Sequence, residues 1–241
     1  MSSVVNGTII RLTARGVLGG RRLWLLVALA LVLVGIAVLT RALVPVSETD
    51  AAMLVQGIAF GTFLPLFGLI VGTGVIGPEI DDGSIIHLLS KPISRHTIVQ
   101  SKLAVAIAAV IGFAVVPTML AAAILGSGGR AVLAFGVGAL AAGALYAVLF
   151  VLLAVVTRHA VIIGLVYALV WESLVGSFVP GARNLSVQQW ALSVTESIAP
   201  PGLVTADVGL GVAWTLILGG FAAATWYAGS RLRVLTLASE D

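Results

Sequence analysis

Long apolar runs alternate with short polar connectors along most of the chain. A helix of about 20 apolar residues crosses a hydrocarbon layer about 30 Å thick. Lipid offers no partners for backbone polar groups, and none of the runs alternates polar with apolar residues, so each run predicts a helix. We therefore expect an all-α membrane protein with six transmembrane helices, at residues 23–39, 53–76, 103–125, 131–156, 160–179 and 208–228.

The composition supports this prediction. Of the 241 residues, 60% are hydrophobic and only 10% are charged, whereas soluble domains contain about 25% charged residues. The mean hydropathy is +1.16. The net charge of +3 does not indicate a nucleic-acid partner, because the basic residues lie at the ends of the apolar runs and form no stripe. Since the chain has no cysteine, disulfides and thiolate metal sites are excluded.

Lysine and arginine are distributed unequally between the two sides of the predicted helices. One side holds Arg41, Arg130 and Arg183. Because cytoplasmic loops are enriched in basic residues, we expect the other side, with both termini, to face the cytoplasm of a cell that carries the protein in its inner or plasma membrane. That side holds ten basic residues: Arg11, Arg15, Arg21, Arg22, Lys91, Arg95, Lys102, Arg158, Arg231 and Arg233.

Two segments outside the six runs also show helical patterns. Residues 1–22 are expected to form an amphipathic helix at the membrane interface, with Arg11 and Arg15 on its polar side. In the outer loop, residues 180–207, Ser186 precedes Gln189 by three positions, as in a capping box, which predicts a short helix on the outer face. The apolar side of the first helix would carry Val5, Ile9, Leu12 and Gly16.

Residues 77–102 form the longest polar connector. Pro78 and the acids after it are expected to end the second helix, and Ser94 is expected to cap the third. Between them we predict a two-turn amphipathic helix that Pro92 stops. An ordinary hydrophilic loop explains the basic residues but not four aliphatic ones, Ile85, Ile86, Leu88 and Leu89. The pattern alone leaves two alternatives open, docking to a soluble partner and lying on the membrane surface.

The motif order in this connector carries a family resemblance. E-x-x-D-G-S is followed by L-L-x-K-P-I-S-R and a later lysine, which resembles the cytoplasmic loop of six-helix ABC exporter permeases (ABC-2 type, type V fold). "YALVWESLVGSFVPGARNLSVQQWALS" (residues 167–193) is similar to the fifth helix and outer loop of bacterial members. The resemblance implies a coupling helix seated in an ABC ATPase subunit, and a second permease copy or homologue. The implied coupling residues are Glu79, Asp82, Gly83, Ile85, Ile86, Leu88, Leu89, Pro92, Arg95 and Lys102.

No phosphate-binding loop accompanies this resemblance. The pattern G-x-x-x-x-G-K-[ST] needs a Gly-Lys pair, and both lysines, Lys91 and Lys102, follow serines. We therefore expect ATP and Mg²⁺ to be bound by the partner ATPase, with no cofactor and no catalytic residue in this chain. His87, His96 and His159 have no metal-ligand spacing, so no metal site is expected either.

Glu172 is an acid deep within a predicted span. Such a residue is costly in lipid and usually marks function, although pairing with Arg183 or a backbone amide would also explain it. If Glu172 carried protons, the protein would be a secondary transporter. A structural or assembly subunit is the third alternative.

The aromatic residues of the second and fifth spans are candidates for the translocation path. Phe60, Phe63 and Phe67 share one helix face, which fits packing or lipid contact. The family resemblance instead implies that they line the path together with Tyr167, Trp171 and Glu172. On the second span, the spacings Gly57/Gly61 and Gly68/Gly72 predict close helix packing.

Overall fold

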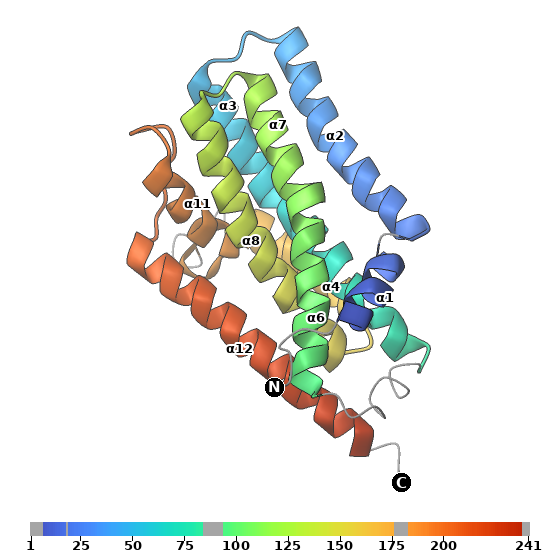
Figure 1. Ribbon diagram of the computed structural model, residues 1–241. Helices are drawn as coiled ribbons and strands as arrows, with labels where there is room; N and C mark the ends of the chain where they lie inside the picture. The colour runs from blue at the N-terminus through green and yellow to red at the C-terminus, as the bar shows by residue number, and fades with distance from the viewer. Residues whose placement is uncertain (1–6, 18, 84–93, 176–182, 238–241) are drawn as a thin grey trace.

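In the computed structural model, the described residues are 7–17, 19–83, 94–175 and 183–237. Every regular element in these ranges is a helix, as the sequence predicts (Figure 1). Five helices are long and apolar enough to cross a membrane: Arg21–Leu43, Glu48–Ile80, Arg95–Leu125, Gly129–Val156 and Leu210–Leu232. The predicted span at residues 160–179 is helical from Ala160 to Val175, and its end lies outside the described residues.

Several of the long helices are composite. The elements in chain order are α1 (Gly7–Val17), α2 (Arg21–Leu43), α3 (Glu48–Leu54), η1 (Val55–Phe63), α4 (Leu64–Asp81), α6 (Arg95–Val110), η2 (Ile111–Val115), α7 (Val116–Leu125), α8 (Gly129–Val156), α9 (Ala160–Val166), η3 (Tyr167–Val175), η4 (Arg183–Leu185), α11 (Val187–Ile198) and α12 (Leu210–Leu237). The short connectors between α7 and α8 and between α8 and α9 are confirmed.

Two wide, π-helical turns interrupt these spans just before prolines. η1 ends two residues before Pro65, and η2 ends two residues before Pro117. A proline ring clashes with the carbonyl four residues earlier and offers no N–H to it. The wider turn relieves this conflict while the helix continues.

Glycines bring α4 close to α8, the central helix. A Cβ atom at Gly72 would lie only 2.6 Å from the carbonyl oxygen of Ala147, and one at Gly68 would collide with Tyr146. The close packing predicted for the Gly68/Gly72 spacing is therefore confirmed. Gly57 instead faces open space.

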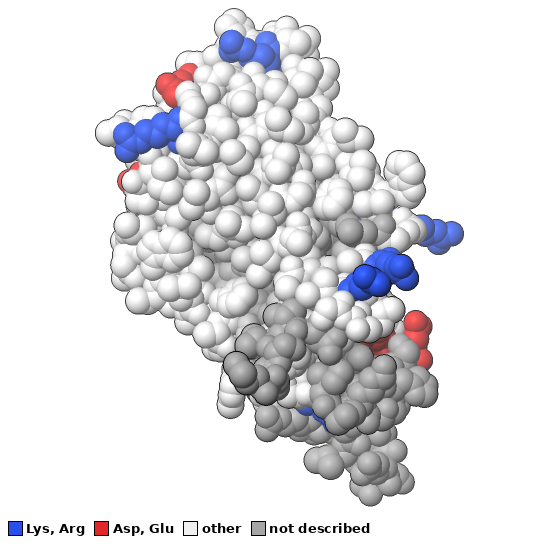
Figure 2. Space-filling view, in the orientation of Figure 1, with Lys and Arg blue, Asp and Glu red and all other residues white. Residues whose placement is uncertain are grey.

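The edges of the bundle present apolar side chains to the surroundings. On α2 only Leu26, Leu33 and Ala37 are buried, and α12 runs along the opposite edge (Figure 1). Figure 2 shows charged atoms gathered toward the two ends of the visible face, with a broad uncharged surface between them. This surface matches a protein surrounded by lipid.

The amphipathic helix near the N-terminus is confirmed as α1. α1 packs on α4 and α6 through Ile9, Thr13 and Val17, which follow one another at four-residue spacing. Of the residues predicted for its apolar side, Ile9 is buried in this contact, whereas Leu12 is 58% exposed and Gly16 is also exposed.

Candidate functional site

The polar connector between α4 and α6 is held at its root, by which we mean the end of α4 and the start of α6. The second helix was expected to end at Pro78 and the acids after it; α4 continues through Pro78 and ends among these acids, at Asp81. Gly83 then adopts a positive φ of 69°, which favours glycine, and the chain turns. The predicted cap of the third helix is confirmed, since the Ser94 hydroxyl accepts the Thr97 N–H at 3.1 Å.

Pro78 leaves one carbonyl of α4 without its usual partner. In an α-helix the carbonyl of Gly74 would accept from the N–H of residue 78, and proline has none. The guanidinium of Arg22, at the start of α2, donates to this carbonyl at 2.8 Å. The proline is thus accommodated inside the helix by a side chain from another span.

Lys102 joins α6 to α4 from a fully buried position. Its Nζ lies 2.7 Å from Glu79 Oε1 and donates to the Val75 carbonyl at 2.6 Å. The Lys102 side chain is 0% exposed and that of Glu79 is 34% exposed. Glu79 and Lys102, the first and last residues of the motif that carries the family resemblance, therefore bind each other. We call Lys102, Glu79 and Val75 the Lys102 clamp.

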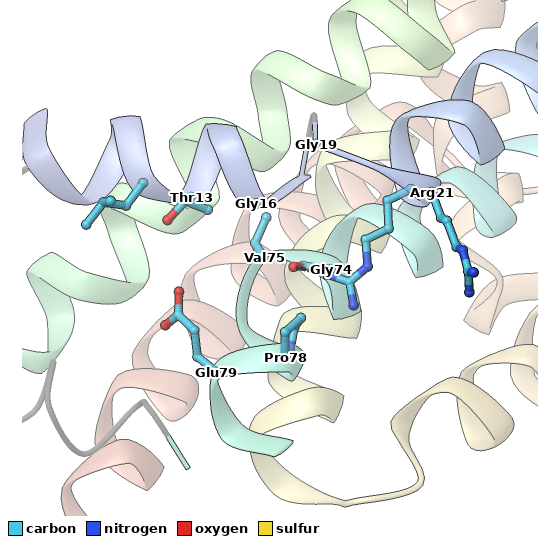
Figure 3. A pocket seen from close by; sticks show the side chains of 10 residues that line it. Thr13, Gly16, Gly19, Arg21, Gly74, Val75, Pro78 and Glu79 are labelled. Carbon is cyan, nitrogen blue, oxygen red and sulfur yellow. Dashed lines mark hydrogen bonds between the residues drawn. The ribbon is translucent and has the colours of Figure 1, made fainter. Parts of the chain in front are cut away.

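A pocket of about 440 Å³ lies beside this clamp, between α1, the start of α2 and α4. Figure 3 shows Thr13 and Gly16 of α1 across the pocket from Val75 and Glu79 of α4. The second carboxylate oxygen of Glu79 is buried and has no hydrogen-bond partner among the described residues.

The remaining predicted coupling residues are placed only in part. Asp82 is exposed, and Arg95 is half-buried at the start of α6. The predicted coupling helix itself lies outside the described residues, and so do Ile85, Ile86, Leu88, Leu89 and Pro92.

Glu172 lies at the other end of the bundle and holds the start of α11. Its Oε1 accepts the Tyr167 hydroxyl at 2.7 Å and the Val187 N–H at 3.1 Å. Its Oε2 accepts the Ser186 hydroxyl at 2.5 Å and the Gln188 N–H at 3.4 Å. Glu172 is fully buried, so these five residues form a closed polar group that we call the Glu172 cluster.

This arrangement selects among the alternatives for Glu172. Arg183 pairs with Asp207 at 2.8 Å and not with Glu172. The carboxylate instead meets backbone N–H groups at a helix start, where negative charge is favoured. Of the partners considered for Glu172, the backbone amide is the one observed.

The predicted short helix of the outer loop is confirmed as α11. Ser186 accepts the Gln189 N–H at 3.4 Å and so caps the helix. Ala191, Leu192 and Val194 are buried, and α11 packs against α8 and α12 inside the end of the bundle.

The aromatic candidates for the path lie mainly in the core. Phe60, Phe63 and Phe67 are buried, and Phe60 packs edge-on against Phe135 at a ring distance of 6.1 Å. Trp171 is half-buried, and its indole N–H donates to the Leu185 carbonyl at 3.4 Å. The structure joins Tyr167 and Glu172 by a hydrogen bond, whereas the ring contacts described for the three phenylalanines are with Phe135 and with one another.

Sequence reasoning missed Arg22, and it did not identify Val187 and Gln188 as the residues whose backbone amides meet Glu172. Pro78 within a helical run was a usable signal, because it predicts a free carbonyl at Gly74. The described residues contain no group of three acidic or histidine side chains that could hold a metal ion.

Comparison with known proteins identifies the family. No curated protein matches the chain. Residues 21–180 match a family described as ABC-2 family transporter protein. That match covers more than half of the 241 residues and includes the whole root of the polar connector. Permeases of this family are membrane components of ABC transporters and not themselves the ATPase. The chain belongs to the ABC-2 transporter family and is a multi-pass membrane protein of its permease type.

Proposed function

We propose that the protein is the permease subunit of an ATP-driven exporter in the cell membrane. It works with a second permease copy or homologue and with two ABC ATPase subunits that bind ATP and Mg²⁺. Six helices span the membrane. Five are the long helices named above, and the additional one contains α9 and η3. Both termini and residues 77–102 face the cytoplasm.

The Lys102 clamp is the observation that carries this proposal. A push on residues 82–94 would act on the end of α4 and the start of α6. Because Lys102 joins these two ends through a side chain and a backbone carbonyl, they would move together. If the ends of α4 and α6 moved independently, a push on the connector would not reach both spans. Because the Lys102 clamp joins them, the push would be transmitted to both.

The translocation path would run beside η3, at the junction with the second permease. The exposed apolar side chains of η3, Leu169 and Val170, offer a surface for this junction. Phe60, Phe63 and Phe67 would reach the path only if η1 and α4 move away from α8 during the cycle. Their role as path residues stays a prediction.

Copurification tests the proposal. Tagged protein should bring down an ABC ATPase, and Ile86→Asp or Leu89→Asp should abolish both this binding and transport while the permease still reaches the membrane. The conservative variants Ile86→Val and Leu89→Met serve as matched controls and should behave as the wild type. Transport that continues without any ATPase and stops when the proton gradient is dissipated would contradict the proposal in favour of a secondary transporter.

A further inference from the structure

A second polar pocket lies at the same end of the bundle as α1, where α2 starts, α8 ends and α9 starts. It has a volume of about 230 Å³, several times the roughly 30 Å³ that one water occupies in the liquid. We call it the arginine pocket, and its polar lining residues are Arg22, Thr73, Thr157, Arg158 and His159.

The charges in the arginine pocket have one sign. Arg158 and His159 are exposed, and none of the described lining residues is acidic. Across the part of the chain that the structure describes, no carboxylate forms an ion pair with Arg22, Arg158 or His159. Arg22 uses one guanidinium nitrogen for the Gly74 carbonyl, and a guanidinium carries five N–H donors. The pocket therefore offers donors and positive charge to an anion.

The wall of this pocket continues as an apolar surface. Val161 and Ile162 line it and are 58% and 64% exposed. Further along α9, Leu165 and Val166 are also exposed. A free phosphate ion would gain nothing from this surface, whereas an acyl chain would be buried along it.

We propose that the arginine pocket binds the phosphodiester headgroup of an anionic phospholipid, with an acyl chain lying on α9. Guanidinium groups suit phosphate oxygens because their donors form a planar fork. Basic pockets between spans at the cytoplasmic side commonly hold such headgroups. The inference depends on the membrane location of the chain and not on ATP coupling or on the exported substrate.

The pocket beside the Lys102 clamp suits the same ligand less well. Arg21 and Arg22 line it, but so does the carboxylate of Glu79. The arginine pocket has no acidic residue in its described lining, so a phosphate meets no carboxylate there.

Native mass spectrometry of the purified protein tests the proposal. The probe lipids are phosphatidylglycerol and phosphatidylcholine, added separately to delipidated protein in detergent. The wild type should retain phosphatidylglycerol in preference. The double variant Arg158→Gln, His159→Gln should bind it about fivefold more weakly, the loss expected for one cation near a lipid phosphate. Arg15→Gln is the matched control, because Arg15 is exposed at the same end and lines neither pocket.

Three outcomes would overturn the proposal. One is equal retention of the two lipids by the wild type. Another is full competition by millimolar glycerol phosphate, which would assign the pocket to a soluble phosphate. The third is an unchanged lipid count with a lost dimer mass in the double variant, which would make this face a contact between copies. A folded double variant, shown by an unchanged elution volume, is required for each comparison.

Discussion

At the scale of single residues, two buried charges explain how polar groups persist in this apolar bundle. Lys102 is fully buried, yet it meets a carboxylate and a carbonyl oxygen. Glu172 is fully buried, yet both of its oxygens accept hydrogen bonds. An unpaired charge in such a place would cost several kcal/mol, so each charge depends on its partners.

Replacing Lys102 with methionine should therefore destabilise the fold. The variant leaves the Glu79 carboxylate without its Lys102 donor, at a cost of about 1–3 kcal/mol. Because Glu79 is partly exposed and can be hydrated, we expect a loss of stability at the lower end of this range. The melting temperature in detergent measures the loss. Lys102→Arg keeps the charge and is the control, and Lys102→Met combined with Glu79→Gln should cost less than the sum of the single changes. Strict additivity would show that the two residues act independently.

Glu172→Gln should loosen the start of α11. A glutamine has one acceptor oxygen and would turn its NH₂ group toward the donors of either Tyr167 and Val187 or Ser186 and Gln188. The expected loss is about 1–3 kcal/mol of unfolding free energy. Hydrogen exchange at the Val187 and Gln188 amides should rise. Tyr167→Phe removes a single hydrogen bond and should cost about 1 kcal/mol. An unchanged exchange rate in Glu172→Gln would refute the anchoring role.

At the scale of elements, the apolar runs were enough to predict helices, and Ser94 was enough to predict where one of them begins. α6 begins at Arg95, directly after its Ser94 cap, although its polar first turn gives no hydropathy signal. α4 continues through Pro78 to Asp81, and hydropathy gave no sign of the donor that accommodates the proline, Arg22, which lies 52 residues away in sequence. The contacts of Glu172 with residues 186–188 were equally hidden, since hydropathy reports nothing about pairings between distant segments.

The hydrogen bond from Arg22 to the Gly74 carbonyl can be tested by changing Pro78, the residue that lacks an N–H for this carbonyl. Arg22→Gln should lower the melting temperature, because it leaves the Gly74 carbonyl without a donor. In a Pro78→Ala background, residue 78 regains an N–H for that carbonyl. There the cost of Arg22→Gln should fall by about 1 kcal/mol. Equal costs in both backgrounds would contradict the explanation.

The contact between α4 and α8 predicts opposite effects for two glycine substitutions. Gly72→Ala places a methyl group against the Ala147 carbonyl and should cost about 1–3 kcal/mol. Gly57→Ala is the matched control, since its methyl group enters open space. It should be neutral, or stabilising by up to about 1 kcal/mol, because alanine favours the helix. Thermal melting in detergent compares the two variants, and a Gly72→Ala variant as stable as Gly57→Ala would contradict close packing.

At the scale of the whole molecule, the two ends of the bundle differ in their basic residues, and α1 lies at the end where α12 finishes (Figure 1). The chain contains no cysteine, so single cysteines can be introduced without a preparatory variant. A membrane-impermeant thiol reagent applied to intact cells should label Thr205→Cys and leave Arg15→Cys unlabelled until the cells are opened. Both positions are exposed. The reverse labelling pattern would invert the proposed orientation.

The wide turns of η1, η2 and η3 have a consequence for motion. Each π-helical turn accommodates one residue more than an α-helix would. If the wide turn shifts by one residue along the helix, the residue that it passes rotates by about 100° around the helix axis. The two ends of the helix stay in place. In the three helices that contain such a turn, this shift would redirect side chains toward a different neighbour without sliding any helix past another.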